Sequence, residues 1–239
     1  MTLNERQKNI LETIIDDYIE TGLPISSLQL IHNHDLGVCS ATIRNDMLDL
    51  TDNGYLYKSY SSSGRVPTSK GYRFFIEEWQ DGKGKSRIEN FFEEFNSEDQ
   101  DDIFSFSNDL LEELSNFSPG LLLNYIFDKD ILWERGWENV VLQPEMQDAD
   151  VLNQFVTLAD VTRGKIKELA AKSQLNDIEV FIGQENPIIK SDEFSIITCR
   201  SKFPKTKQGC AFVLIGPKRM PYRQNLDLFK SVINFLQKT

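Results

Sequence analysis

A helical stretch followed at once by a basic hairpin is the feature that most limits what this chain can fold into. Wound as a helix, residues 40–53 bring Ile43, Met47 and Leu50 onto one stripe. The other side, near the helix start, carries a methyl, a hydroxyl, a guanidinium and an amide, on Ala41, Thr42, Arg44 and Asn45. Such groups read base edges in a major groove, where Arg pairs with guanine, Asn with adenine, and methyl groups contact thymine. The pattern predicts a helix with one packed face and one reading face.

The segment after this helix has the composition of a DNA-contacting hairpin. Gly54 provides a helix stop, residues 55–60 alternate aromatic and polar like a strand, and residues 61–67 form the tip. Between Gly54 and Ile76 there is no acidic residue. Basic and hydroxyl side chains suited to phosphate contacts occur here at Lys58, Ser63, Arg65, Thr68, Lys70 and Arg73. We predict the wing of a winged helix-turn-helix.

Two capping signals predict the helices that come before. Asn4 with Gln7, and Ser26 with Gln29, have capping-box spacing. An apolar stripe follows the first signal and is stopped near Gly22. Three helices and a hairpin therefore form a predicted DNA-binding domain over residues 1–79.

Charge is distributed unevenly along the 239 residues. The net charge is -11, yet residues 77–115 alone contain thirteen acidic and three basic residues. This composition predicts an acidic helical linker over residues 80–120. No apolar run is long enough for a membrane span, and three scattered cysteines fit the cytoplasm. We expect no membrane association.

The remaining sequence predicts an α/β domain over residues 121–239. Amphipathic helices are expected over 151–169 and 226–236, with strands at 178–182, 194–198 and 211–215. A further helix, capped by Ser97, should turn Phe104, Leu111 and Leu114 toward a core. Residues 121–127 are compatible with a buried strand or a short helix. The fold class is therefore α+β: a winged helix, a helical linker and a small sheet with helices, similar to half of a GAF-type sensor domain.

Several runs closely resemble the bacterial heat-inducible transcription repressor HrcA family. They are LNERQKNILETIIDDYIETGLPISS (3–27), SATIRND (40–46) and NGYLYKSYSSSGRVPTSKGYRFFIE (53–77). VFIGQENP (180–187) and VLIGPKRMPY (213–222) resemble two further signatures of the same family. The space between is shorter than in the family, so much of the sensor-like and inserted region is expected to be missing.

The resemblance implies a homodimeric repressor that binds an inverted-repeat operator, the CIRCE element, ahead of chaperone genes. It also implies a link to the chaperonin GroEL, which keeps family members active. Positions that the family turns toward DNA correspond to Ser40, Thr42, Arg44 and Asn45 on the helix and to Ser63, Gly64, Arg65, Lys70, Tyr72 and Arg73 on the wing.

Catalytic motifs are absent from the sequence. There is no GxGxxG after a strand, Walker A loop, HExxH, paired CxxC or GxSxG. We therefore expect no enzyme activity, no catalytic residues, no cofactor and no metal. Two alternatives stay open: a winged-helix regulator of another regulon with a metabolite in its C-terminal sheet, and an enzyme with an appended winged helix.

Overall fold

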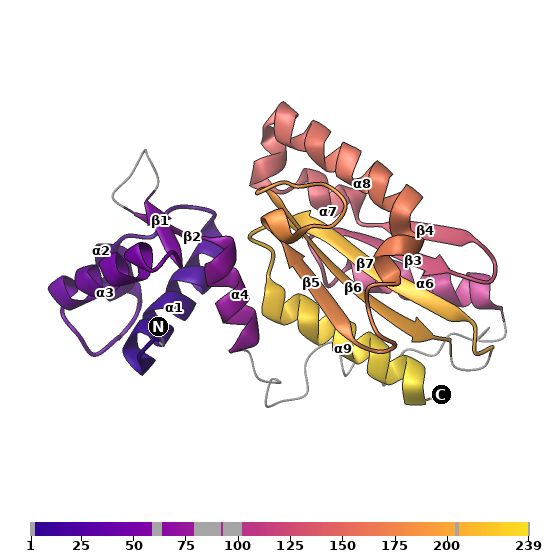
Figure 1. The fold of residues 1–239 in the computed structure, drawn as a ribbon, viewed down its shortest axis with the longest axis horizontal. Helices are drawn as coiled ribbons and strands as arrows, with labels where there is room; N and C mark the ends of the chain where they lie inside the picture. Colours follow the sequence, from indigo (N-terminus) through magenta and orange to yellow (C-terminus); the bar gives the residue numbers. More distant parts are fainter. Residues whose placement is uncertain (1–2, 59–63, 79–91, 93–101, 204–205, 239) are drawn as a thin grey trace. The chain divides into compact units, whose positions relative to one another are not determined.

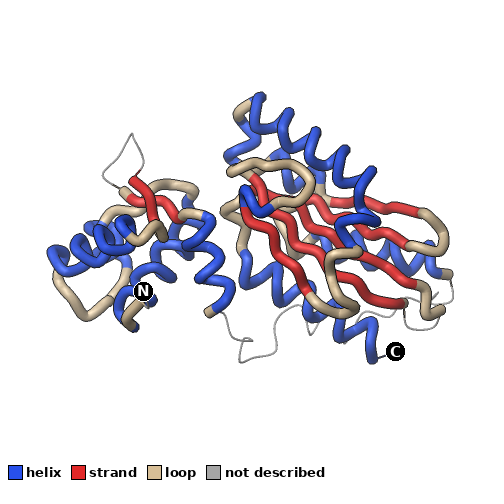
Figure 2. Tube along the Cα trace, viewed as in Figure 1, coloured by secondary structure: helices blue, strands red, loops and turns tan. Residues whose placement is uncertain are grey.

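The computed structural model describes residues 3–58, 64–78, 92, 102–203 and 206–238 (Figure 1). The chain divides into two compact units, Met1–Gln80 and Asp81–Thr239. Both contain helices and strands, which confirms the mixed α and β class (Figure 2). Residues 61–63 of the expected wing tip and the expected cap at Ser97 lie outside the described residues, whereas residues 65–67 of that tip form a strand.

The described residues of the N-terminal unit form four helices and a two-stranded ribbon. Their bounds are α1 Glu5–Thr21, α2 Ser27–Asn33, α3 Ser40–Asp52, β1 Leu56–Lys58, β2 Arg65–Pro67 and α4 Ser69–Glu77. The strands β1 and β2 are antiparallel, with Lys58 opposite Arg65. Ile25, in the loop before α2, forms an antiparallel bridge with Arg65 and so extends the ribbon.

Local sequence signals begin and end these helices as predicted. Asn4 accepts a hydrogen bond from the Gln7 amide at 2.9 Å, and the Gln7 side chain accepts one from the Asn4 amide at 3.3 Å. Ser26 and Gln29 form the second capping box. Gly22 ends α1 in the left-handed region at φ 67°, which glycine adopts without a Cβ clash.

A single apolar core joins the elements of this unit. The predicted stripe of α1 is buried through Ile10, Leu11, Ile14 and Ile15. The predicted stripe of α3 is buried through Ile43, Met47 and Leu50. Contacts of α1 with α3, β2 and α4 close the unit. Burial of one α3 face leaves the other free to face solvent.

The C-terminal unit is built on a five-stranded antiparallel sheet in the order β4-β3-β7-β6-β5. Its strands are β3 Leu121–Ile126, β4 Ile131–Arg135, β5 Ile178–Ile182, β6 Phe194–Lys202 and β7 Gly209–Pro217. Its helices are α6 Ile103–Ser115, α7 Trp137–Val141, η1 Pro144–Gln147, α8 Ala149–Ala170, η2 Gly183–Glu185 and α9 Tyr222–Lys238. The three predicted strands and both predicted amphipathic helices are present. Residues 121–126 form a strand because they pair on both sides, with β4 and β7.

Helices cover both faces of this sheet (Figure 1). On one face, Phe155 and Leu158 of α8 belong to one apolar cluster with Leu121 and Leu123 of β3, and Phe155 contacts Phe194 of β6 edge to face. On the opposite face, Tyr222 of α9 shares a hydrogen bond with Ser195 of β6 at 2.7 Å. The helix α6 lies on that second face too, because Phe106 of α6 stacks on Phe235 of α9.

Two expectations for the C-terminal unit need correction. The helix α6 begins at Ile103 with Asp102 as its cap, and Phe104 is 42% exposed, whereas Leu111 and Leu114 are buried as expected. Because α6 packs against β3 and β4, this part of the expected acidic linker contributes to the folded unit. The strand β4 was not predicted, since every residue in it is only half-buried and no alternation marks it.

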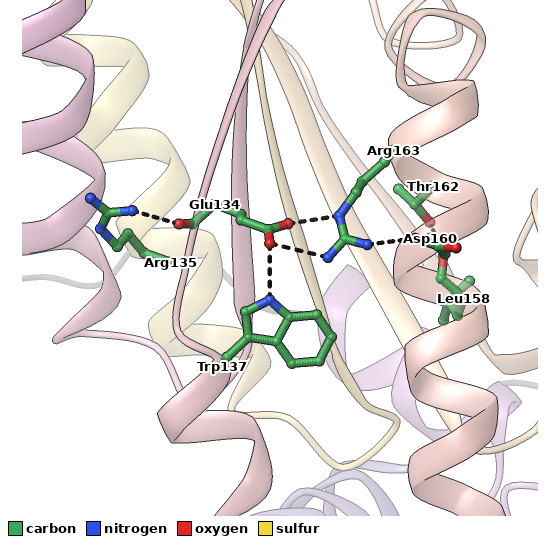
Figure 3. Close-up of polar contacts among 7 residues, drawn as sticks. All are labelled: Glu134, Arg135, Trp137, Leu158, Asp160, Thr162 and Arg163. Carbon is green, nitrogen blue, oxygen red and sulfur yellow. Dashed lines mark hydrogen bonds and ion pairs between the residues drawn. The ribbon is translucent and has the colours of Figure 1, made fainter.

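Polar contacts fasten α8 to the edge strand β4 (Figure 3). Arg163 of α8 donates to both carboxylate oxygens of Glu134, at 2.7 Å and 3.1 Å. Trp137 donates its indole N–H to the same carboxylate at 3.2 Å, and the Arg163 guanidinium lies 5.7 Å from the Trp137 ring centroid. The Glu134 carboxylate therefore accepts hydrogen bonds from both the Arg163 guanidinium and the Trp137 indole.

Candidate nucleic-acid interface

The first two turns of α3 present a polar surface to solvent. Ala41, Arg44 and Asn45 are exposed, while Ser40 and Thr42 are half-buried. Within the described ranges, no hydrogen bond or ion pair is found for Arg44 or Asn45. Farther along the helix, the exposed side chains include Asp49 and Asp52, whose carboxylates would repel phosphate. The surface best suited to DNA is thus the N-terminal half of α3.

Cys39 caps the start of α3 and lies on the exposed side. Its sulfur is 3.3 Å from the Thr42 hydroxyl oxygen. This hydrogen bond, with further ones from the backbone N–H groups of Thr42 and Ala41, lowers the pKa of the Cys39 thiol. The other two cysteines, Cys199 and Cys210, are buried.

The basic residues of the ribbon occupy different environments. Lys58 is exposed on β1, and Arg73 is half-buried on α4. Arg65 is half-buried and donates its Nε–H to the Thr51 hydroxyl of α3 at 3.0 Å. Lys70 is exposed, donates to the Asn53 carbonyl at 2.8 Å and lies 4.3 Å from the Tyr55 ring centroid. Arg65 and Lys70 therefore support the end of α3 as well as carrying charge.

Three other candidate residues have contacts that shape the ribbon. Thr68 caps α4 and donates its hydroxyl to the Gly54 carbonyl at 2.7 Å. Gly64 is buried, and a Cβ added there would lie 2.6 Å from the Pro24 carbonyl oxygen. Tyr72 is fully buried. These positions fix where the exposed side chains lie.

Sequence patterns did not single out the contacts that hold α3 against α1. Arg6 in the first turn of α1 forms a two-point ion pair with Asp46, which is 3% exposed. The next residue, Gln7, donates its side-chain amide to Asp49 at 3.3 Å. The residues of each pair are about forty positions apart, so no local pattern could reveal them. The only available signal was an acidic residue within an apolar helical stripe.

An open groove of about 440 Å³ lies on the C-terminal unit. It runs between the first half of α8 and the segment before β6, and is lined by Asp150, Asn153, Gln154, Thr157, Ile189, Lys190, Ser191 and Phe194. Ligand pockets commonly have 300–1,000 Å³. Among the residues that the structure describes, no cluster of three or more His, Cys, Asp or Glu side chains could hold a metal ion. No helix in these same ranges is long and apolar enough to cross a bilayer.

The chain is thus a two-unit protein. Its first unit exposes the polar face of α3, and its second unit is an α/β domain. The family model described as "HrcA protein C terminal domain" matches residues 72–225. This range is more than half of the chain, and the chain belongs to the HrcA family.

Curated relatives carry the name "Heat-inducible transcription repressor HrcA". The relative from Acetivibrio thermocellus is 51% identical over 78 residues, which are 33% of this chain and 22% of that protein. One from Clostridium botulinum is 39% identical over 123 residues, covering 49% of this chain and 36% of that protein. These alignments thus span about a quarter to a third of each relative.

A relative from Oceanobacillus iheyensis aligns along nearly its whole length. It is 25% identical over 335 positions that cover 99% of this chain and 97% of the relative. Because 335 positions exceed the 239 residues here, part of the relative has no counterpart in this chain. A crystal structure of a hypothetical protein has the same fold, with TM-score 0.79, 20% identity and coverage of 99% and 98%.

Proposed function

We propose that this chain is a DNA-binding transcription repressor of heat-shock genes. The observation that carries the proposal is the exposure of Arg44 and Asn45 on α3, opposite a buried apolar stripe. The helices α2 and α3 with the β1–β2 ribbon are proposed as a winged helix-turn-helix. The name of the relatives supports the same function, and gives no indication of catalysis.

In this proposal, base edges are read by Ser40, Ala41, Thr42, Arg44 and Asn45 of α3. Phosphates are contacted by the ribbon and the start of α4, with Lys58, Arg65, Lys70 and Arg73 supplying charge and Ser63 a hydroxyl. Gly64, Thr68 and Tyr72 belong to the same interface, and their described contacts indicate that they act by shaping it. The domains are proposed as 1–79 for DNA binding, 80–120 as a connecting segment whose helix α6 packs on the following sheet, and 121–239 as a GAF-like unit for dimerisation.

The operator is proposed to be an inverted repeat of the CIRCE type bound by a homodimer. Two reading helices related by a two-fold axis need half-sites about 34 Å apart, one turn of the duplex. Selection of bound duplexes from a random pool tests sequence, symmetry and spacing together. Enrichment of a repeat with that spacing supports the proposal, and a pool without any enriched sequence contradicts it.

Base reading is tested with the Arg44→Ala variant on the enriched duplex and on a scrambled one. Loss of a two-point guanine contact should weaken binding to the enriched duplex by about 1–3 kcal/mol and leave the scrambled duplex almost unchanged. Lys129→Ala removes one exposed positive charge from the C-terminal unit and is the matched control. Equal losses on both duplexes would exclude base reading by Arg44.

The inducing signal is proposed to reach the repressor through the chaperonin GroEL. Addition of purified chaperonin should then raise the fraction of protein able to bind the operator, and an unfolded competitor protein should abolish the gain. No change in active fraction would remove the chaperonin from the proposal.

A metabolite-sensing regulator is the second candidate, and the groove beside α8 favours it. Its polar lining by Asn153, Gln154, Thr157 and Lys190 suits a small polar ligand. Thermal shifts with a metabolite panel, repeated on Asn153→Leu, test this function. A ligand that stabilises the parent but not the variant would support it.

A further inference from the structure

Asp46 is a carboxylate within the buried side of α3. It is 3% exposed and falls between Ile43, Met47 and Leu50 in the helical repeat. Removing a carboxylate from water is costly unless it is paired and hydrogen-bonded. The partner that Asp46 has is Arg6, in the first turn of α1.

The Arg6–Asp46 contact has a defined direction. Arg6 donates from Nε to Oδ2 at 2.7 Å and from Nη2 to Oδ1 at 3.1 Å. Two parallel bonds between planar groups fix their relative orientation as well as their distance. Apolar contacts, by comparison, are non-directional and tolerate a small rotation of one helix on another. The two parallel hydrogen bonds between Arg6 and Asp46 therefore constrain the rotation of α3 about its own axis.

The first turn of α1 makes a second contact one turn farther along α3. Gln7 donates its amide N–H to Asp49 at 3.3 Å, while its amide oxygen is held in the capping box by Asn4. The longer distance and the exposure of this pair make it the weaker of the two. Both contacts start from consecutive residues of one rigid turn.

Rotation of α3 matters because Arg44 and Asn45 directly precede Asp46 in the chain. A side chain reaches about 6 Å from a helix axis, so a rotation of about 10° moves its tip by about 1 Å. Hydrogen bonds to base edges need donor and acceptor within a range of about 0.5 Å. A small rotation of α3 would thus weaken hydrogen bonds to base edges more than it weakens attraction to phosphates, because the latter depends less on exact position.

We propose that Arg6 is a positioning residue for sequence discrimination, which it controls through Asp46 by setting the rotation of α3. This inference rests on the proposed role of α3 as the reading helix. In the complex Arg6 itself need not touch DNA.

The test compares affinities for the enriched and the scrambled duplex, at two salt concentrations and well below the thermal midpoint. Arg6→Met should reduce the ratio of the two affinities about tenfold, the effect of losing one two-point base contact. Binding to the scrambled duplex and its salt dependence should stay unchanged. Arg6→Lys keeps the positive charge but cannot form the two parallel hydrogen bonds. Its affinity ratio should lie between those of Arg6→Met and the parent protein.

A double variant separates positioning from stability. Arg6→Met with Asp46→Leu removes the buried carboxylate together with its partner, whose side chain is 48% exposed, so that no unpaired charge is left inside the unit. The thermal midpoint of the double variant should lie above that of Arg6→Met alone, in which Asp46 has lost its partner. The affinity ratio should stay as low as in Arg6→Met. Recovery of both would overturn the proposal, because Arg6 would then act only by stabilising the unit.

Other outcomes are equally decisive. Lys8→Met removes a positive charge from the same turn, one bound to Glu5 and Glu78 rather than to α3. An equal fall of the affinity ratio in this control would overturn the proposal. So would a loss of affinity of Arg6→Met for both duplexes together with a flatter salt dependence, because that result indicates a direct phosphate contact. If the parent protein itself fails to prefer the enriched duplex, the proposed function fails instead.

Discussion

Arg65 on the ribbon donates its Nε–H to the Thr51 hydroxyl on α3, at 3.0 Å. The contact joins the ribbon to the last turn of α3. A guanidinium carries several N–H donors, and its positive charge also attracts phosphate. A basic residue of the proposed wing can therefore have a structural and a DNA-binding role together.

Variants at both ends of this contact should separate the two roles. Arg65→Ala should weaken binding to enriched and scrambled duplexes alike and reduce the salt slope by about one. Thr51→Val breaks the same hydrogen bond but keeps the charge, so it should leave the slope unchanged. Each should lower the free energy of unfolding by about 1 kcal/mol. Titrations at several salt concentrations check this, and an unchanged slope for Arg65→Ala would deny the phosphate contact.

Two glycine-to-alanine substitutions should have opposite effects on stability. An alanine Cβ at Gly64 would lie 2.6 Å from the Pro24 carbonyl oxygen, so the ribbon must shift and the unit should lose about 1–3 kcal/mol. At Gly164, within α8, nothing lies within 4 Å of the new Cβ, and helix propensity should add up to about 1 kcal/mol. Denaturant unfolding of both variants measures the signs.

The three cysteines should differ sharply in reactivity. The lowered pKa of Cys39 leaves more thiolate at a given pH, so its alkylation should reach half its maximal rate at a lower pH than that of an unperturbed thiol. Burial raises the pKa of Cys199 to about 12 and also raises that of Cys210, so both should react only after unfolding. Mass spectrometry after iodoacetamide treatment gives the sites. Bound operator should protect Cys39, and labelling at an unchanged rate would place the DNA elsewhere.

The contact between α8 and β4 should contribute to the stability of the C-terminal unit. Glu134→Gln removes the charge that Arg163 contacts at two points, and should cost about 1 kcal/mol because the pair is only partly shielded from solvent. Asp160→Asn is the matched control, since Asp160 contacts the same guanidinium but its side chain is 75% exposed. It should change the free energy of unfolding little. An equal loss of unfolding free energy in both variants would mean that the two-point contact of Glu134 contributes no more to stability than the exposed contact of Asp160.

Much of the N-terminal unit could be predicted because its signals are local. The capping boxes at Asn4 and Ser26 and the apolar stripe of α3 each need only a few neighbouring residues. The side of α3 that faces solvent followed from the same stripe. Local order and amphipathic spacing thus located the proposed reading face before any tertiary contact was known.

Other features depend on partners far away in the chain. Residues 121–126 have no period that separates strand from helix, and their pairing with β7 decides between the two. Arg65, Lys70 and Tyr72 share a basic, hydroxyl-rich segment, yet one bonds to Thr51, one to Asn53 and one is buried. The Arg6–Asp46 pair spans forty positions. Composition indicates the kind of surface, but tertiary contacts decide which side chains form it.

The pairing of β3 with β7 has a consequence for biosynthesis. The elements α3, β2 and α4, which contact α1, are all made within the first 80 residues, so the N-terminal unit can close early. The strand β3, by contrast, must wait for Gly209–Pro217 to leave the ribosome, a delay on the order of ten seconds at usual synthesis rates. Until then its buried, mostly apolar residues are without their neighbour in the centre of the sheet. The nascent chain is most in need of protection from aggregation during that interval.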